Sequence, residues 1–208
     1  MPDYTLFTNP MSRGQIARWA LHEAGVGYDQ VLVDWAEKPA ALLAVNTMGK
    51  VPTLVHRSET GERVVTECAA ICAYLAESEP EAELLPSDAE LADYYRWMFF
   101  AAGPVEQAIV GRSMGWEVPK EREAMVGYGS LERVLDTLDG HFAGHDFVCG
   151  SRFTMADVYV GSQIDWGLTF GSIPPRETFV AYAERIQARA AYKAAKAIDN
   201  QLIQAAKQ

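Results

Sequence analysis

The spacing of apolar residues changes near residue 80, and this change restricts the possible folds more than any other feature of the sequence. Before it, short β-type runs alternate with helical patterns, whereas after it nearly every apolar pattern has helical spacing. Two prolines and three glutamates interrupt both patterns between Ser78 and Pro86. The sequence therefore predicts an α/β domain over residues 1–78, a linker over 79–86 and an all-helical domain over 87–208.

The expected elements follow from these patterns and from the turn residues between them. The β-type runs are Tyr4–Phe7, Tyr28–Val33, Val51–His56 and Arg63–Val65. Helical spacing starts near Ser12, at Pro39 and at Glu67 in the first part of the chain. The helices expected later are residues 88–113, 121–143, 154–168 and 176–189, with a helical tail from 191.

Composition and charge exclude several classes of function. The 208 residues include 18 basic and 28 acidic side chains, a net charge of −10, and no basic run, which argues against nucleic-acid binding. No apolar stretch approaches the ~20 residues that cross a bilayer, and the first residues lack a basic segment followed by an apolar one. We therefore expect a cytoplasmic protein without membrane contact. Three cysteines and four histidines, none at framework or ligand spacing, predict neither a disulfide scaffold nor a metal site.

A proline stands at the start of an apparently buried strand in the segment Gly49-Lys50-Val51-Pro52-Thr53-Leu54. Proline cannot donate a hydrogen bond to a sheet, so one reading is simply an edge strand. The other is a cis peptide before Pro52, which turns the backbone of Val51 outward and makes it available to an extended, peptide-like ligand.

Two helix starts carry polar residues. Thr66-Glu67-Cys68 opens directly into an apolar helix, whose first N–H groups form a natural site for a carboxylate, although a simple helix cap is the alternative. Phe153-Thr154-Met155-Ala156-Asp157 has the spacing of a capping box, in which Thr154 and Asp157 bond each other's backbone. We interpret this second pattern as structural.

Taken in order along the chain, these segments resemble the cytosolic glutathione transferase family, in its serine-type, bacterial-like form. Two further segments complete the resemblance: F-x-x-G-P-x-E at Phe100–Glu106, and V-x-G-x-x-F-T-x-A-D-V at Val148–Val158. The resemblance implies a thioredoxin-like N-terminal domain, an all-helical C-terminal domain and a homodimer with glutathione in each N-terminal domain. It implies an enzyme of detoxification, in which glutathione as co-substrate is conjugated to a small hydrophobic electrophile.

The same resemblance implies roles for individual residues in binding glutathione. The backbone of Val51, next to Pro52, would pair with the cysteinyl part of the ligand, and Lys50 would lie near the glycyl carboxylate. Glu67 and Cys68 would hold the γ-glutamyl end. The family usually has serine in place of Cys68, and a thiol is the weaker donor, so the backbone N–H must contribute more here.

For the thiolate, the resemblance implies Ser12, at the junction between the first loop and the first helix. Tyr4 lies too early in its strand to be the family's catalytic tyrosine. Thr8 and Asn9 are nearby polar alternatives that stay open. The electrophile pocket is expected between the domains, with Met11, Phe100 and Trp116 as its lining.

Two other functions remain possible at this point. One is a glutathione-dependent disulfide reductase or peroxidase, and the other is a non-catalytic binding protein that shares the fold. The presence of Ser12, Lys50, Pro52 and Glu67 together argues against the non-catalytic alternative.

Overall fold

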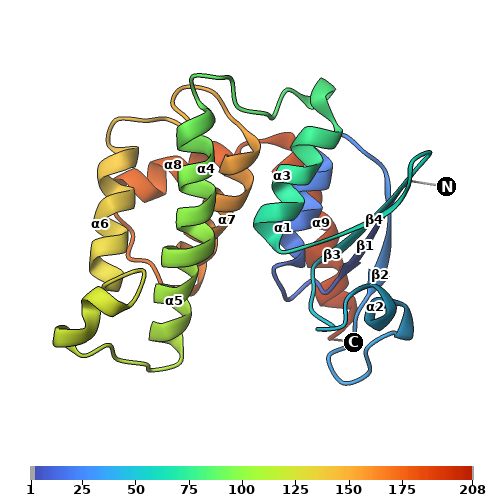
Figure 1. Ribbon diagram of the computed structural model, residues 1–208, viewed down its shortest axis with the longest axis horizontal. Coiled ribbons are helices and arrows are strands. Elements are labelled where there is room, and N and C mark those ends of the chain that lie inside the picture. Colours follow the sequence, from blue (N-terminus) through green and yellow to red (C-terminus); the bar gives the residue numbers. More distant parts are fainter. Residues whose placement is uncertain (1–2, 208) are drawn as a thin grey trace. The chain divides into compact units, whose positions relative to one another are not determined.

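The computed structural model describes residues 3–207, which form two compact units. The first unit contains the described residues up to Leu85 together with those from Ala188 onward, and the second is Pro86–Gln187. Figure 1 shows the mixed sheet of the first unit and the helices of the second. This architecture confirms the expected α/β part followed by helices.

The sheet of the first unit has four strands in the order β2-β1-β3-β4. They are β1 (Tyr4–Thr8), β2 (Tyr28–Leu32), β3 (Thr53–Ser58) and β4 (Gly61–Thr66). Strand β2 is parallel to β1, whereas β3 is antiparallel to both β1 and β4. The helices between and after them are α1 (Gly14–Glu23), α2 (Ala40–Val45) and α3 (Cys68–Ser78), followed by a 3-10 turn, η1 (Pro80–Ala82).

Apolar side chains from the sheet and α2 make one hydrophobic cluster of this unit. Phe7, Val33, Leu42 and Val55 are all buried in it. Because side chains alternate between the two faces of a strand, Phe7 and Val55 reach α2 on one face while their neighbours face α1 and α3.

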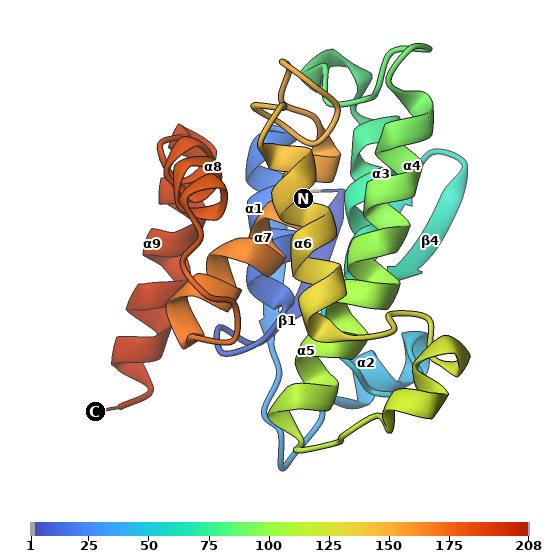
Figure 2. The ribbon, with the colours of Figure 1, turned by 90° about the vertical axis from the view of Figure 1, so that its left-hand side faces the viewer.

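The last helix, α9 (Ala190–Ala205), belongs to the first unit and not to the helical domain in which the sequence analysis placed it. It lies beside α1 (Figure 2). Arg18 of α1 and Asp199 of α9 form a fully buried ion pair with an Nε–Oδ1 distance of 2.9 Å, and Trp19 contacts Tyr192 edge to face. These partners lie about 180 residues apart, so helical periodicity alone carries no information about the pairing.

The second unit is built from helices. They are α4 (Leu91–Phe100), a π-helical turn η2 (Ala101–Val105), α5 (Glu106–Ser113), a 3-10 segment η3 (Lys120–Met125), α6 (Leu131–Phe142), α7 (Met155–Phe170) and α8 (Glu177–Gln187). Phe147 and Gly150 form an isolated β-bridge. In the described part of the chain, no helix is both long and apolar enough to span a membrane.

Two helix boundaries differ from the sequence-based expectation. The helix expected from residue 121 begins only at Leu131, after the N-cap Ser130, because Gly129 has a positive φ of 64° that a right-handed helix cannot include. The helix expected over residues 88–113 starts at Leu91 and passes through the π-helical turn at Pro104, whose ring removes a backbone donor.

The capping box at the start of α7 is present as predicted. The backbone N–H of Thr154 donates to the Asp157 carboxylate at 2.8 Å. Asp157 is completely buried, and burial raises its pKa to about 6, while bonds from Val148, Thr154 and Tyr182 act in the opposite direction. At neutral pH the group is therefore still ionised and can accept these bonds.

Candidate active site

Three segments meet at one end of the sheet of the first unit. Phe7 pairs with Thr53 across β1 and β3, so the loop after β1 lies next to the Val51-Pro52 segment that precedes β3. Thr53 also pairs with Thr66 of β4, which brings Glu67 and Cys68 to the same end. The register thus gathers the residues that the sequence analysis assigned to the γ-glutamyl, cysteinyl and thiolate parts of one ligand.

The Val51-Pro52 peptide is cis, which is the second of the two readings that the sequence leaves open. Pro52 is buried and Val51 is half-buried. Within residues 3–207, neither the N–H nor the C=O of Val51 has a backbone hydrogen-bond partner. This segment therefore offers one donor and one acceptor at the end of β3.

Glu67 and Cys68 form the start of α3. Glu67 is exposed and has φ 64° and ψ 121°, a backbone conformation that costs a residue with a side chain about 1–3 kcal/mol and is concentrated at ligand-binding positions. The Cys68 thiol donates to the Arg13 carbonyl at 3.5 Å, which ties the start of α3 to the start of α1. The first N–H groups of α3 have no acceptor within the helix and suit a carboxylate.

Lys50 is exposed on the loop before Val51. Its carbonyl accepts hydrogen bonds from Thr53 Oγ1 at 2.9 Å and Asn46 Nδ2 at 3.2 Å, so the loop backbone is fixed while the ammonium group extends into solvent. A second lysine, Lys38, lies against Gly49 of the same loop. The position of Lys38 beside this loop has no signal in the sequence, because no motif or spacing connects the two segments.

Ser12 lies in the turn between β1 and α1. Its hydroxyl donates to the Asn9 carbonyl at 2.7 Å and accepts from the Gly14 N–H at 2.9 Å. The same Asn9 carbonyl also accepts the Ser12 N–H at 3.1 Å. The carbonyl would keep a donor if the hydroxyl proton turned elsewhere, so Ser12 can redirect its proton at little cost.

Thr8 and Asn9, the two alternatives to Ser12, lie in surroundings that suit a structural role. Thr8 is fully buried at the end of β1, and its hydroxyl has no hydrogen-bond partner in the described part of the chain. Asn9 donates through Nδ2 to the Val33 carbonyl and accepts the Met11 N–H, so its side chain holds the loop together. Of the three, Ser12 has the hydroxyl that is both accessible and polarised by a donor.

Tyr4 is engaged away from this turn. Its hydroxyl donates to the Glu79 carboxylate at 2.6 Å, and its ring stacks on His56. Burial, followed by the bond to Glu79, raises its pKa well above the ordinary value for tyrosine. Tyr4 is therefore unsuited to stabilise a thiolate, which agrees with the sequence-based argument that it is not the catalytic tyrosine.

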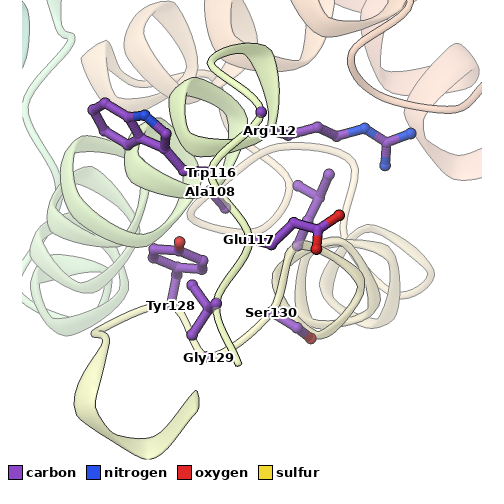
Figure 3. Close-up of a pocket in the computed structure, with 10 residues that line it drawn as sticks. Ala108, Arg112, Trp116, Glu117, Tyr128, Gly129 and Ser130 are labelled. Carbon is purple, nitrogen blue, oxygen red and sulfur yellow. The ribbon is translucent and has the colours of Figure 1, made fainter. Parts of the chain in front are cut away.

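The residues expected to line the electrophile pocket belong to different units. Met11 is exposed in the first unit, and Phe100 of the second is half-buried with its ring edge to face against Trp97. Trp116 is exposed and lines a pocket of about 320 Å³ between the end of α5 and the start of α6 (Figure 3). Arg112, Glu117 and Tyr128 are polar residues of the same pocket. A shared role for Met11, Phe100 and Trp116 stays a prediction.

Among residues 3–207 there is no group of three or more His, Cys, Asp and Glu side chains arranged to hold a metal ion.

Comparison with known proteins adds a family assignment to this geometry. Residues 2–77 match the family model described as "Glutathione S-transferase, N-terminal domain", and residues 119–166 match the one described as "Glutathione S-transferase, C-terminal domain". Together the two matches cover more than half of the chain.

Several individual proteins are similar over most of the chain. Glutathione S-transferase GstA of Escherichia coli O157:H7 is 27% identical over 88% of this chain and 92% of its own length. A crystal structure of a glutathione transferase from Methylococcus capsulatus superposes with a TM-score of 0.77 at 28% identity, covering 95% of this chain and 99% of that one. A sphingomonad glutathione S-transferase complexed with glutathione superposes with a TM-score of 0.72 at 27% identity, covering 94% and 98%.

Two other relatives have different names. The disulfide-bond oxidoreductase YghU of Escherichia coli K12 is 29% identical over 68% of this chain and 51% of its own length. Elongation factor 1-gamma 3 of Oryza sativa is 32% identical over 64% of this chain but only 32% of its own length.

Proposed function

This chain belongs to the glutathione S-transferase family, and we propose that it is a serine-type enzyme that conjugates the sulfur of glutathione to small hydrophobic electrophiles. The observation that carries the proposal is the pair of hydrogen bonds at Ser12. Its hydroxyl accepts a hydrogen bond from the Gly14 N–H and donates one to the Asn9 carbonyl, which also accepts a hydrogen bond from the Ser12 N–H.

The chemical task at this site is to ionise a thiol. A free thiol has a pKa of ~8.5, so only a few per cent is thiolate at pH 7. Lowering that pKa by ~2 units requires ~2.7 kcal/mol of preferential stabilisation of the anion. A charge-assisted hydrogen bond supplies ~1.5–3 kcal/mol, and the N-terminus of a helix adds ~0.3–1 kcal/mol.

In this proposal the Ser12 hydroxyl supplies the hydrogen bond and the start of α1 supplies the helix contribution. Rotation about its Cβ–Oγ bond moves the hydroxyl proton from the Asn9 carbonyl to the ligand sulfur without moving the backbone. The Gly14 N–H bonded to Oγ makes the hydroxyl a stronger donor, because hydrogen bonds in a chain polarise one another. Helix α1 starts at Gly14, so its N-terminal end lies beside the same turn.

The remaining parts of glutathione have partners in the segments at the same end of the sheet. The free N–H and C=O of Val51 suit the ligand's peptide backbone, as in the addition of one short strand. The start of α3 suits the γ-glutamyl carboxylate, while Glu67 can bind the amine next to it. Lys50 and Lys38 supply positive charge for the glycyl carboxylate.

A glutathione-dependent disulfide reductase or peroxidase is the second candidate function. The similarity to a disulfide-bond oxidoreductase favours this alternative. The same thiolate would serve either reaction, because both begin with attack by the glutathione sulfur.

A homodimer and a cytoplasmic location also stay predictions from the sequence.

The experiment that separates these functions has two steps. Retention on immobilised glutathione, with elution by free glutathione, tests binding. Turnover is then compared with a chlorinated nitroaromatic, a glutathione mixed disulfide and an organic hydroperoxide. Conjugation should be the fastest reaction. Binding without any turnover would establish the non-catalytic alternative, and faster turnover of the disulfide or hydroperoxide would establish the second candidate function.

A further inference from the structure

The side chain of Gln15, in the first turn of α1, connects the turn that contains Ser12 to the C-terminal helix. Gln15 Nε2 donates to the Pro10 carbonyl at 2.5 Å. Gln15 Oε1 accepts a hydrogen bond from Lys196 Nζ of α9 at 2.8 Å. Lys196 is therefore connected to Pro10 through two hydrogen bonds, both of which are made by the Gln15 amide.

These two contacts fix the orientation of the amide. The oxygen and nitrogen of a glutamine amide have nearly the same shape, so the polarity of the partners decides which end faces which neighbour. Lysine can only donate and a carbonyl can only accept. Lys196 therefore keeps the amide oxygen on the α9 side, which leaves the N–H₂ group for Pro10.

Lys196 itself is held in place. Its ammonium group lies over the ring of Tyr192, 5.4 Å from the ring centroid, and Tyr192 packs edge to face against Trp19 of α1. One helical turn further on, the buried pair of Arg18 and Asp199 fixes α9 to α1. These contacts hold α9 against α1 and keep Lys196 next to Gln15.

Within residues 3–207, two side chains tie the first residues of the Asn9–Ser12 turn to other parts of the first unit. On one side Asn9 Nδ2 binds the Val33 carbonyl after β2, and on the other side Gln15 binds the Pro10 carbonyl. Proline has no N–H, so the Pro10 carbonyl is the only backbone polar group through which this residue can be held. Among the described side-chain bonds, losing the one from Gln15 leaves Pro10 without a side-chain donor, while Asn9 keeps its bond to Val33.

We propose that Gln15 and Lys196 are positioning residues that hold the Pro10–Ser12 turn so that the Ser12 hydroxyl points at the glutathione sulfur. The proposal rests on the function proposed above. It assigns the last helix of the chain a part in a reaction that takes place in the N-terminal segment, through Gln15 and without contact with the substrate.

Gln15→Glu is the sharpest variant, because it keeps the size of the side chain and its contact with Lys196 but removes the donor to Pro10. We expect kcat to fall roughly 10–100-fold, since small displacements of a catalytic group have effects of this size. KM for glutathione should change less than ~3-fold, because the other glutathione contacts come from β3, α3 and their loops. The pKa of the bound thiol, followed by thiolate absorbance, should rise by about one unit.

Lys196→Met should also lower kcat, but by less than Gln15→Glu does. Lys196→Arg should keep kcat close to that of the parent, because arginine also donates a hydrogen bond. The matched control is Lys193→Met, an exposed lysine on the same helix, which should leave turnover and the thiol pKa unchanged. The double variant Gln15→Glu with Lys196→Met should lose no more than Gln15→Glu alone, because both changes break one connection.

Ser12→Ala, measured alongside, separates this inference from the proposed function. If Ser12→Ala lowers turnover and raises the thiol pKa while folded Gln15→Glu and Lys196→Met match the parent, the connection is structural only and the inference is wrong. If the parent protein does not ionise bound glutathione at all, the proposed function fails and the inference fails with it.

Discussion

Asp157 shows how one buried carboxylate can hold several segments of the second unit. Four donors surround it: the backbone N–H groups of Val148 and Thr154, the Thr154 hydroxyl and the Tyr182 hydroxyl. Each is buried, so each would lose a partner and gain no water if the carboxylate were removed. Asp157 therefore connects the start of α7 to α8 and to the loop before α7.

Asp157→Ala should lower the free energy of unfolding by at least ~3 kcal/mol, because several buried donors are left unsatisfied at once. Ser130→Ala, which removes the cap of α6 and a single exposed bond to the Arg133 N–H, should cost only ~0.5–2 kcal/mol. Denaturant unfolding of both variants checks the difference. Equal losses would show that the additional donors to Asp157 contribute nothing.

The sequence predicts part of this arrangement. The spacing of Thr154 and Asp157 is local, so the capping box can be recognised from five residues. Tyr182 lies 25 residues further on, and nothing in its surroundings in the sequence connects its hydroxyl to Asp157. Local hydrogen bonds leave a sequence pattern, whereas bonds between distant segments depend on packing.

Among the elements, α9 differs most from the expectation. The sequence predicts a helical tail from residue 191, and the structure has a helix over Ala190–Ala205. Its place beside α1 involves the buried pair of Arg18 with Asp199, which the local sequence does not reveal. Burial raises the pKa of Asp199, and the neighbouring Arg18 opposes this effect. Motifs in the sequence propose roles for Ser12, Val51 and Glu67, whereas no motif connects Gln15 with Lys196, because that contact joins segments about 180 residues apart.

Asp199→Ala should destabilise the protein by ~3–5 kcal/mol, because it leaves the Arg18 guanidinium buried without its counter-charge. The matched control is Arg57→Ala, which breaks the exposed pair with Glu62 and should cost less than ~1 kcal/mol. Chemical denaturation measures both. If Asp199→Ala lost no more than the control, α9 would not depend on this ion pair.

At the scale of the whole molecule, buried titratable groups set how stability depends on pH. Burial lowers the pKa of His22 and of His141, so the unfolded chain takes up these protons first and stability falls as pH drops below ~6.5. Asp157 acts in the opposite direction. Its pKa is raised from 3.8 to about 6, so this group favours the folded state more strongly as pH falls through that window.

His141→Gln isolates one of these contributions. The His141 ring lies against Trp97 and His145, and its Nε2 is 2.9 Å from the Val148 carbonyl, a contact that a glutamine amide can replace. Between pH 7 and pH 5 the free energy of unfolding should fall less for the variant than for the parent. The difference between the two losses should be under ~1 kcal/mol, because solvent screens this half-buried group. Denaturant midpoints at the two pH values test this; identical pH dependence would contradict it.

Ser12 is proposed to ionise bound glutathione, and the pKa of the bound thiol in Ser12→Ala measures this role with the fewest intermediate steps. The substitution removes one hydroxyl and leaves the Val51 backbone and the start of α3 in place. By analogy with the loss of one oxyanion-hole donor, we expect turnover to fall ~10²–10³-fold while the affinity for glutathione stays within a few-fold. The thiol pKa, read from thiolate absorbance, should rise towards its free value. An unchanged pKa together with unchanged turnover would contradict the account and transfer the role to Thr8 or Asn9.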